Sequence, residues 1–302
     1  MVRLAVIRLA VLLAVCVGAF AQVEPGVLPQ SWMTGGPDCV AVPDWQVHAY
    51  NDRFYILRES GCIHYEKPFL YLIFGDDRVL LEDTGAGNVN TAAFVQGLIA
   101  KWAKAHSRSA PTLVVVHSHA HGDHTAGDKD LRATAGVEFI APTSAAIAER
   151  AGIGKWPDTL GSIDLGNRVV DVIPIPGHND ASIALYDRRT GILLTGDSLY
   201  PGRLYVNEPD LDTYAASARR LADFVRAHAV THVLGTHIEQ TDTAFADYPV
   251  GTTYQPHEHA LALTRAHVIE LEDAINKRKE GDTQPIPLPD FTISIRPARK
   301  PR

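Results

Sequence analysis

The chain has little cysteine, no long hydrophobic run after its N-terminal segment and no excess of positive charge. Each of these absences excludes a class of protein. Three cysteines occur in 302 residues, and none lies in the closely spaced pairs that a cysteine zinc site requires. Beyond the N-terminal segment no apolar stretch approaches the length that spans a bilayer, so we expect no stable membrane anchor. The sequence also contains no solenoid-type repeat and no low-complexity block, which favours a globular domain.

Acidic residues outnumber basic ones. The chain has 35 Asp and Glu against 28 Lys and Arg, a formal charge of −7, which becomes −9 (−7 minus 2) if Arg3 and Arg8 are removed with a leader peptide. An acidic protein binds nucleic acid phosphates poorly, so we expect no nucleic acid partner. The basic stretch from Arg296 to Arg302 is interpreted as a frayed terminus.

The N-terminal segment is typical of a secretory signal peptide. It has a basic start, an apolar stretch and small residues at Ala19 and Ala21, which together predict a signal peptide at 1–21. We therefore expect a periplasmic or secreted protein. The mature chain would consist of one domain at 22–280 and an irregular C-terminal tail at 281–302, where prolines are frequent and no strong periodicity appears.

The cysteines fit an exported protein. A lipoprotein attached through Cys16 is disfavoured, because Val15 is bulky where such signals have a small residue. Cys39 and Cys62 remain after cleavage, and in an oxidising compartment we expect them to form a disulfide that joins the N-terminal strands.

Hydrophobic periodicity predicts a layered α/β domain. Extended patterns run from about Trp45 to Asp83, and an apolar stripe in Thr91 to His106 predicts an amphipathic helix over that sheet. Helical spacing recurs in Tyr214 to Val225 and in Leu261 to Ile275. Strands that alternate with helices in this way favour sheets inside and helices outside.

Four short apolar runs are each followed by side chains that can bind a metal. The first run, Leu113 to Val116, precedes four such residues within six positions, which solvation of a surface loop does not explain. Imidazole and carboxylate groups suit zinc first, with iron or manganese as alternatives. The candidate ligands are His119, His121, Asp123, His124, His178, Asp197 and His237.

The histidine segment resembles a known family. His119-Ala-His121-Gly-Asp123-His124 is similar to the His-x-His-x-Asp-His signature of the metallo-β-lactamase superfamily, and the later histidines and aspartate follow in the family's order. Asp83-Thr-Gly resembles the turn that precedes the signature. The resemblance covers about Tyr71 to Glu239 and implies an α/β fold of the four-layer αββα sandwich type.

The resemblance also implies a dinuclear site and a role for each ligand. One metal would be held by His119, His121 and His178, the other by Asp123, His124 and His237, with Asp197 between them. Asp83 would orient a ligand from outside this set. Two zinc ions lower the pKa of a shared water from 15.7 toward about 7, and the resulting metal-bridging hydroxide would hydrolyse an ester, lactone or thioester bond of a small acyl substrate.

Two other activities and one inactive state compete with this interpretation. Asp197 favours the resemblance to hydroxyacylglutathione hydrolases and lactonases, because the true β-lactamases of the superfamily usually lack a bridging carboxylate. A periplasmic β-lactamase stays the nearest alternative, followed by an oxidoreductase similar to the mononuclear iron persulfide dioxygenases. A metal-binding scaffold without turnover is the third.

Several residues outside the ligand set are candidates for substrate contacts. Tyr200 and Tyr205 follow the bridging aspartate and offer phenols to a developing oxyanion, although buried tyrosines more often pack with a satisfied hydroxyl. We expect the loop Ile238 to Pro256 to flank the site. The candidates for substrate binding are Tyr254, His257 and His259. The two histidines lie at the start of an expected helix, and a structural role is the alternative for them.

Overall fold

The computed structural model describes residues 23–34, 38–39, 42–87 and 89–298. The predicted signal peptide therefore lies outside the described residues. Among the residues that are described, no helix is long and apolar enough to cross a membrane. The predicted disulfide is confirmed, because Cys39 and Cys62 are bonded with their Cα atoms 5.4 Å apart.

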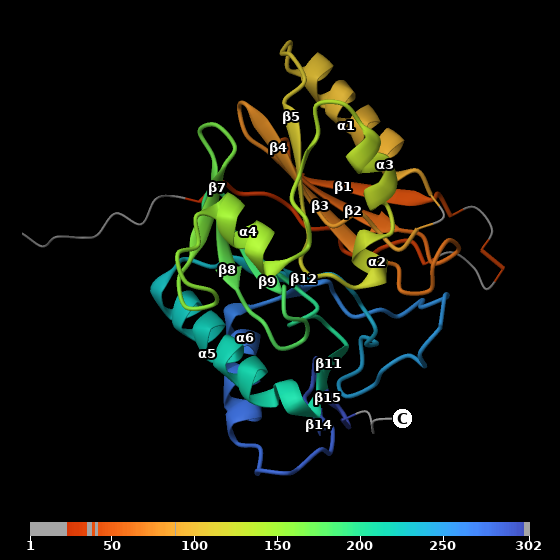
Figure 1. The fold of residues 1–302 in the computed structure, drawn as a ribbon. Helices are drawn as coiled ribbons and strands as arrows, with labels where there is room; N and C mark the ends of the chain where they lie inside the picture. The colour runs from red at the N-terminus through yellow and green to blue at the C-terminus, as the bar shows by residue number, and fades with distance from the viewer. Residues whose placement is uncertain (1–22, 35–37, 40–41, 88, 299–302) are drawn as a thin grey trace, which may run out of the picture.

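Two six-stranded sheets form the centre of the molecule (Figure 1). The first follows chain order and is antiparallel from β1 to β4, then parallel through β5 and β6. All six residues of β3 are buried, as expected of a strand covered on both faces. The strands are β1 (Trp45–Asn51), β2 (Phe54–Glu59), β3 (Phe69–Phe74), β4 (Arg78–Glu82), β5 (Thr112–Val116) and β6 (Glu138–Phe139).

The second sheet has the order β13-β12-β10-β9-β8-β7, and its β10 and β12 run parallel. It is assembled from apolar runs like those of the first sheet, with every residue of β9 and β10 buried. Its strands are β7 (Gly161–Asp164), β8 (Val169–Pro174), β9 (Ile183–Asp187), β10 (Ile192–Gly196), β12 (His232–Gly235) and β13 (Ala262–Leu263).

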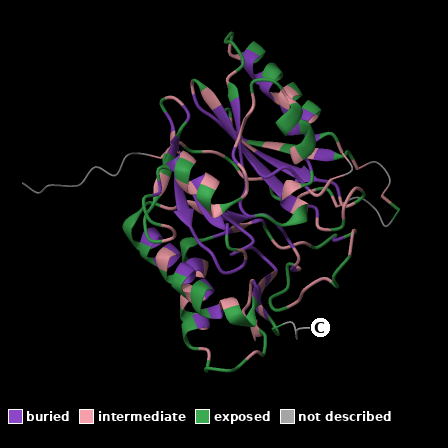
Figure 2. Ribbon diagram, in the orientation of Figure 1, coloured by how far each residue is buried: buried purple, intermediate pink, exposed green. Residues whose placement is uncertain are grey.

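Helices cover the outer faces of both sheets. The inner faces pack against each other in one cluster that includes Tyr71 and Val114 of the first sheet and Leu194 of the second. Helix α1 (Thr91–Ala105) packs on the first sheet, where Trp102 stacks on Phe74 with ring centres 4.5 Å apart. Helices α5 (Leu211–Ala227) and α6 (Arg265–Asn276) cover the second sheet. The predicted four-layer αββα sandwich is confirmed, and Figure 2 shows largely buried strands between helices that have exposed residues on their outer sides.

Three short helices connect these layers. Helix α2 (Gly122–Thr125) contains two of the candidate ligands, α3 (Asp128–Ala133) follows it directly, and α4 (Ser144–Ala151) precedes β7. The histidine segment that follows β5 therefore leads straight into a helical turn, which directs its side chains back toward the edge of the sheets.

The prediction of an irregular tail at 281–302 was wrong for its central part. Strands β14 (Ile286–Pro287) and β15 (Thr292–Arg296) form a third sheet with β11 (Arg203–Asn207), in which β15 is parallel to β11. The reason is an alternation of only three buried residues, Phe291, Ile293 and Ile295. It is too short to dominate the surrounding prolines in a sequence pattern.

The expected helix start at His257 and His259 was also wrong. Helix α6 begins at Arg265, where the Thr264 side chain accepts a hydrogen bond from the backbone of Ala266 and caps the helix. Residues 256–261 form turns and an isolated bridge between Thr241 and Glu258 instead.

Candidate metal centre

The candidate ligands meet where four strands end. His119, His121 and the residues of α2 follow β5, and His178 follows β8. Asp197 directly follows β10, and His237 lies just after β12, the parallel neighbour of β10. The carboxyl ends of parallel strands lie at the same edge of a sheet, so residues far apart in the sequence converge there.

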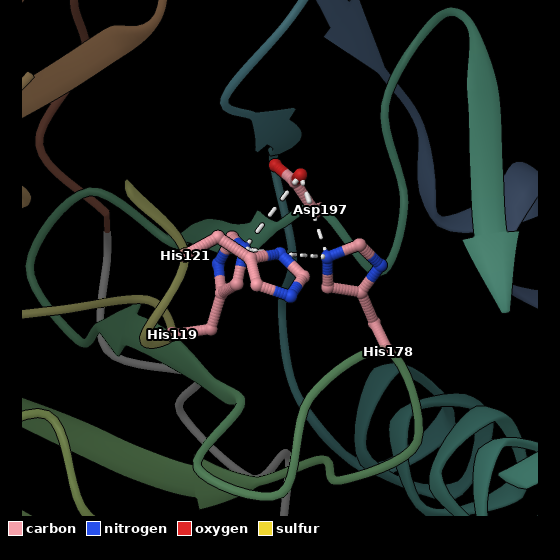
Figure 3. A group of neighbouring side chains, drawn as sticks. All are labelled: His119, His121, His178 and Asp197. Atoms are coloured by element: carbon pink, nitrogen blue, oxygen red, sulfur yellow. Dashed lines mark hydrogen bonds and ion pairs between the residues drawn. The ribbon is translucent and has the colours of Figure 1, made fainter. Parts of the chain in front are cut away.

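Three histidines and one aspartate form the first group, with one ligand atom from each within 4.8 Å of the others. His121 Nδ1 lies 2.9 Å from His119 Nε2 and 3.0 Å from His178 Nε2, as Figure 3 shows. Asp197 Oδ2 lies 3.8 Å from His119 Nε2 and 3.6 Å from His178 Nε2. Three ring nitrogens and a carboxylate oxygen that point at one centre match the donor set of a divalent transition metal.

The second group shares Asp197 with the first. It comprises Asp123, His124, His237 and Asp197, whose ligand atoms again lie within 4.8 Å of one another. Asp123 Oδ2 lies 3.0 Å from His124 Nε2 and 3.3 Å from His237 Nε2. The other oxygen of Asp197, Oδ1, lies 3.2 Å from His237 Nε2. Asp197 thus presents one oxygen to each group, which is the arrangement of a bridging carboxylate.

Hydrogen bonds on the outer side of the histidines orient their inner nitrogens. His178 Nδ1 donates to the backbone oxygen of Tyr205 at 2.7 Å, and His237 Nδ1 donates to that of Glu66 at 3.0 Å. His124 Nδ1 donates to Asp83 at 2.8 Å. In each ring the proton is therefore held on Nδ1, which leaves the Nε2 lone pair directed into the site.

Asp83 lies fully buried behind the site at the end of β4. Besides His124, its carboxylate accepts hydrogen bonds from the Ser118 backbone at 2.7 Å and from Ser118 Oγ at 2.8 Å. The Asp83 backbone has φ +66°, a left-handed conformation that aspartate tolerates better than most residues. Asp83 thus connects the turn after β4 to the histidine segment.

The electrostatics of the two groups differ, and both suit a cation. Burial lowers the pKa of His119 and of His178, so these imidazoles are neutral at pH 7 and offer lone pairs. In the second group burial opposes protonation, but the neighbouring carboxylates raise the pKa of His124 and His237. The carboxylates of this group create a local excess of negative charge, which would stabilise a bound cation.

The two groups lie at the base of a cavity of about 330 Å³. The predicted flanking loop is confirmed as one of its walls, since residues 249–252 and Gln255 line it. This loop is held in place: Lys67 Nζ donates to the backbone oxygen of Thr252 at 2.9 Å. Just beyond the loop, the buried Arg58 forms a two-pronged ion pair with Glu258 at 2.7 and 2.5 Å.

Sequence reasoning missed the cationic side chains that line the cavity. They are Lys67 from the segment before β3, Arg203 from β11 and Arg296 from β15. Arg203 pairs with Glu239 at 3.1 Å and with Asp247 at 3.4 Å. No motif marks these positions, because they depend on how the third sheet packs beside the site.

The two tyrosines proposed for oxyanion contacts differ in their surroundings. The Tyr200 hydroxyl lies 2.5 Å from the backbone oxygen of Arg203 and 3.1 Å from Glu239 Oε2, so its single proton is already engaged. The Tyr205 hydroxyl accepts from Arg203 Nε at 3.1 Å, which leaves its own proton available. Both residues line the cavity.

The three residues predicted for substrate binding do not line this cavity. Tyr254 is 36% exposed. His257 lies 3.8 Å from Asp242 at the surface, and His259 Nε2 lies 3.0 Å from Asp290. Both histidines flank Glu258, which forms an isolated bridge with Thr241. His259 instead has a structural role, connecting this segment to the turn before β15.

Comparison with known proteins identifies the class. Residues 68–237, more than half of the chain, match the family model of the metallo-beta-lactamase superfamily. The chain therefore belongs to this superfamily, as its histidine segment predicted.

Two curated relatives are hydrolases. The chain is 32% identical over 96 residues to a hydroxyacylglutathione hydrolase of Erythrobacter litoralis, an alignment that covers 31% of this chain and only 38% of the relative. It is 24% identical over 227 residues to the acyl-coenzyme A thioesterase MBLAC2 of Bos taurus, covering 64% of this chain and 81% of the relative.

Solved structures agree on the fold. A metallo-beta-lactamase from Pontibacter korlensis superposes with a TM-score of 0.52 at 16% identity, over 78% of this chain and all of that one. The TMB-1 structure gives 0.53 at 16% identity, over 78% of this chain and 99% of that one. At this identity the likeness concerns the fold alone.

Proposed function

We propose that this protein is a dinuclear metal-dependent hydrolase that cleaves the thioester, or a related ester or lactone bond, of a small acyl substrate. The observation that carries the proposal is the position of Asp197, which offers one carboxylate oxygen to each of two complete ligand groups. A second complete ligand group is what a dinuclear hydrolase requires. This favours the hydrolase over a persulfide dioxygenase.

The ligand groups fit two metal ions of the zinc type. His119, His121 and His178 would hold one, Asp123, His124 and His237 the other, and Asp197 would contact both. Two such ions supply a water activated at neutral pH and a Lewis acid for the acyl oxygen. The surrounding residues orient the ligands through the outer hydrogen bonds to Asp83, Glu66 and Tyr205.

The relatives support the choice of bond. A hydroxyacylglutathione hydrolase and an acyl-coenzyme A thioesterase both act on thioesters, so we place thioesters first among the acyl bonds. The shared carboxylate at Asp197 favours this group over β-lactam hydrolysis, which stays the nearest competitor.

The test is a comparison of substrates before and after metal removal. Protein stripped with a chelator should hydrolyse no acyl thioester, and added zinc should restore hydrolysis. An Asp197→Asn variant should lose turnover, whereas His257→Ala, which changes a surface histidine outside the cavity, should keep it. Nitrocefin turnover that exceeds turnover of every thioester, ester and lactone would contradict the proposal and favour a β-lactamase.

We further propose that the protein is exported. The support is the signal peptide pattern in 1–21, together with a disulfide of the kind that persists in oxidising compartments. N-terminal sequencing of protein from a periplasmic or culture fraction should begin at Gln22. A mature protein found only in the cytoplasm with Met1 intact would contradict it.

A further inference from the structure

A second cavity adjoins the metal centre on the side of the third sheet. Its volume is about 440 Å³, and it shares His121, His178, Tyr205 and Arg296 with the first cavity. Asn207 and Asp210 line its far part. A substrate bound at the ligand groups can therefore extend past the two histidines into a space that the reacting bond does not fill.

Arg296 lies at the junction of the two cavities and is exposed. Its guanidinium carbon lies 3.8 Å from the centre of the Tyr205 ring. Stacking on an aromatic face fixes the plane of a guanidinium and leaves its N–H edges free for a planar anion. Tyr205 also accepts the hydrogen bond of His178 Nδ1 through its backbone oxygen. One residue thus positions both the cation and a candidate metal ligand.

Among the described residues, Arg296 forms no ion pair with a carboxylate. No Asp or Glu side chain of the described residues lies within 4.0 Å of it, and no residue outside the described ranges is an Asp or Glu. The other two cations of the first cavity are engaged: Arg203 pairs with two carboxylates, and Lys67 donates to two backbone oxygens.

We infer that Arg296 is a specificity residue that binds a carboxylate or phosphate carried by the substrate, on the part that extends from the reacting acyl carbon into the second cavity. The inference rests on the proposed hydrolase function and narrows its substrate class to anionic acyl compounds. A cationic side chain that lines both cavities attracts an anionic group of the substrate through charge complementarity.

The experiment compares one neutral and three anionic thioesters. The acetyl thioester of N-acetylcysteamine is neutral. The acetyl thioester of glutathione carries carboxylates on the thiol part, and that of coenzyme A carries phosphates there. The succinyl thioester of N-acetylcysteamine carries its carboxylate on the acyl part. For the anionic substrate that reaches Arg296, Arg296→Gln should lower kcat/KM about tenfold, mainly through KM, because a charge-assisted hydrogen bond is lost. The neutral thioester should change less than twofold.

Two control variants separate recognition from structure. Arg296→Lys keeps the charge and should recover part of the loss. Arg219→Gln changes an exposed arginine of α5 that lines neither cavity and should affect no substrate. Equal effects of Arg296→Gln on all four thioesters, or no effect on any of them, would overturn the inference. The substrate that responds identifies whether the anion is a carboxylate or a phosphate.

A binding measurement keeps this inference separate from the proposed function. S-methylglutathione and S-methyl-coenzyme A have no bond to hydrolyse, and calorimetry of the metal-replete protein measures their affinity directly. At least one should bind more tightly than neutral S-methyl-N-acetylcysteamine, and Arg296→Gln should remove the difference. If no thioester is hydrolysed but this difference is present, the hydrolase proposal fails and the anion site holds. If neither anionic thioether is preferred and Arg296→Gln leaves the succinyl thioester unaffected, the anion site fails.

Discussion

Replacing Asp83 with asparagine tests how the chain orients its metal ligands. The carboxylate accepts three hydrogen bonds, from the Ser118 backbone, Ser118 Oγ and His124 Nδ1, at 2.7 to 2.8 Å. Asparagine has the same shape but only one acceptor oxygen. Because Ser118 N and His124 Nδ1 are both donors, one of them must face the new amide group.

The expected effect on metal affinity follows from this loss. Asp83 is fully buried, so water cannot replace the missing acceptor. A hydrogen bond to a charged group contributes about 1.5 to 3 kcal/mol, which corresponds to roughly 10- to 100-fold in affinity for the metal that His124 binds. Affinity at the group that contains His119 should change less.

Competition with a zinc chelator measures both affinities in the wild type and the variant. The matched control is Asp171→Asn, which changes a buried carboxylate of β8 that pairs with Arg188. We expect weaker zinc binding in Asp83→Asn alone. If the titration curves of the two variants coincide, Asp83 does not orient a ligand and this part of the account is refuted.

Three further predictions concern the surroundings of the site. Glu258→Leu leaves the buried Arg58 without its partner (the side chains of Arg58 and Glu258 are 1% and 6% exposed) and should destabilise the fold by about 3 to 5 kcal/mol. In urea unfolding, the double variant with Arg58→Met should recover most of this stability. If the losses of the two single variants simply add in the double variant, the pairing is contradicted. Tyr200→Phe should keep near-full kcat on the best acyl substrate, because the Tyr200 hydroxyl is hydrogen-bonded to the backbone oxygen of Arg203 and to Glu239. A hundredfold loss of kcat would show instead that the phenol acts on the substrate. Burial raises the pKa of Glu59 to about 7, so the stability that this carboxyl contributes is present below about pH 4.5 and lost as pH rises through 7. Glu59→Gln should therefore unfold at higher urea than the wild type at pH 8 but not at pH 4, and equal midpoint differences at both pH values would contradict the shift.

The sequence was most informative where one strand end carries several ligands. The segment His119 to His124 follows a buried strand and resembles the metallo-β-lactamase signature, and that resemblance predicted both the fold and the convergence of two ligand groups. The glycine before Asp197 belongs to the same local pattern: Gly196 has φ +52°, and a Cβ there would lie 2.8 Å from Ser118 Cβ. The apolar run and the glycine that follows it are local and therefore visible in the sequence, whereas the close approach to Ser118 is a tertiary contact.

The cavity walls could not be predicted in this way. Arg296 became a wall residue because β15 returns to pair with β11, a contact between segments some 90 positions apart. His257 and His259 were considered for the wall because they lie just after the flanking loop, but neither lines the cavity of the metal centre. Positions of this kind depend on tertiary packing, for which the surrounding sequence carries no periodic signal.

The most direct test of the central claim is a zinc titration of the metal-free protein, with bound zinc and thioester hydrolysis measured in the same samples. If two ligand groups act together through Asp197, hydrolysis should reach its maximum only near about two zinc ions per chain. Full activity at one metal ion per chain, or no acyl hydrolysis at any zinc content, would contradict a dinuclear hydrolase.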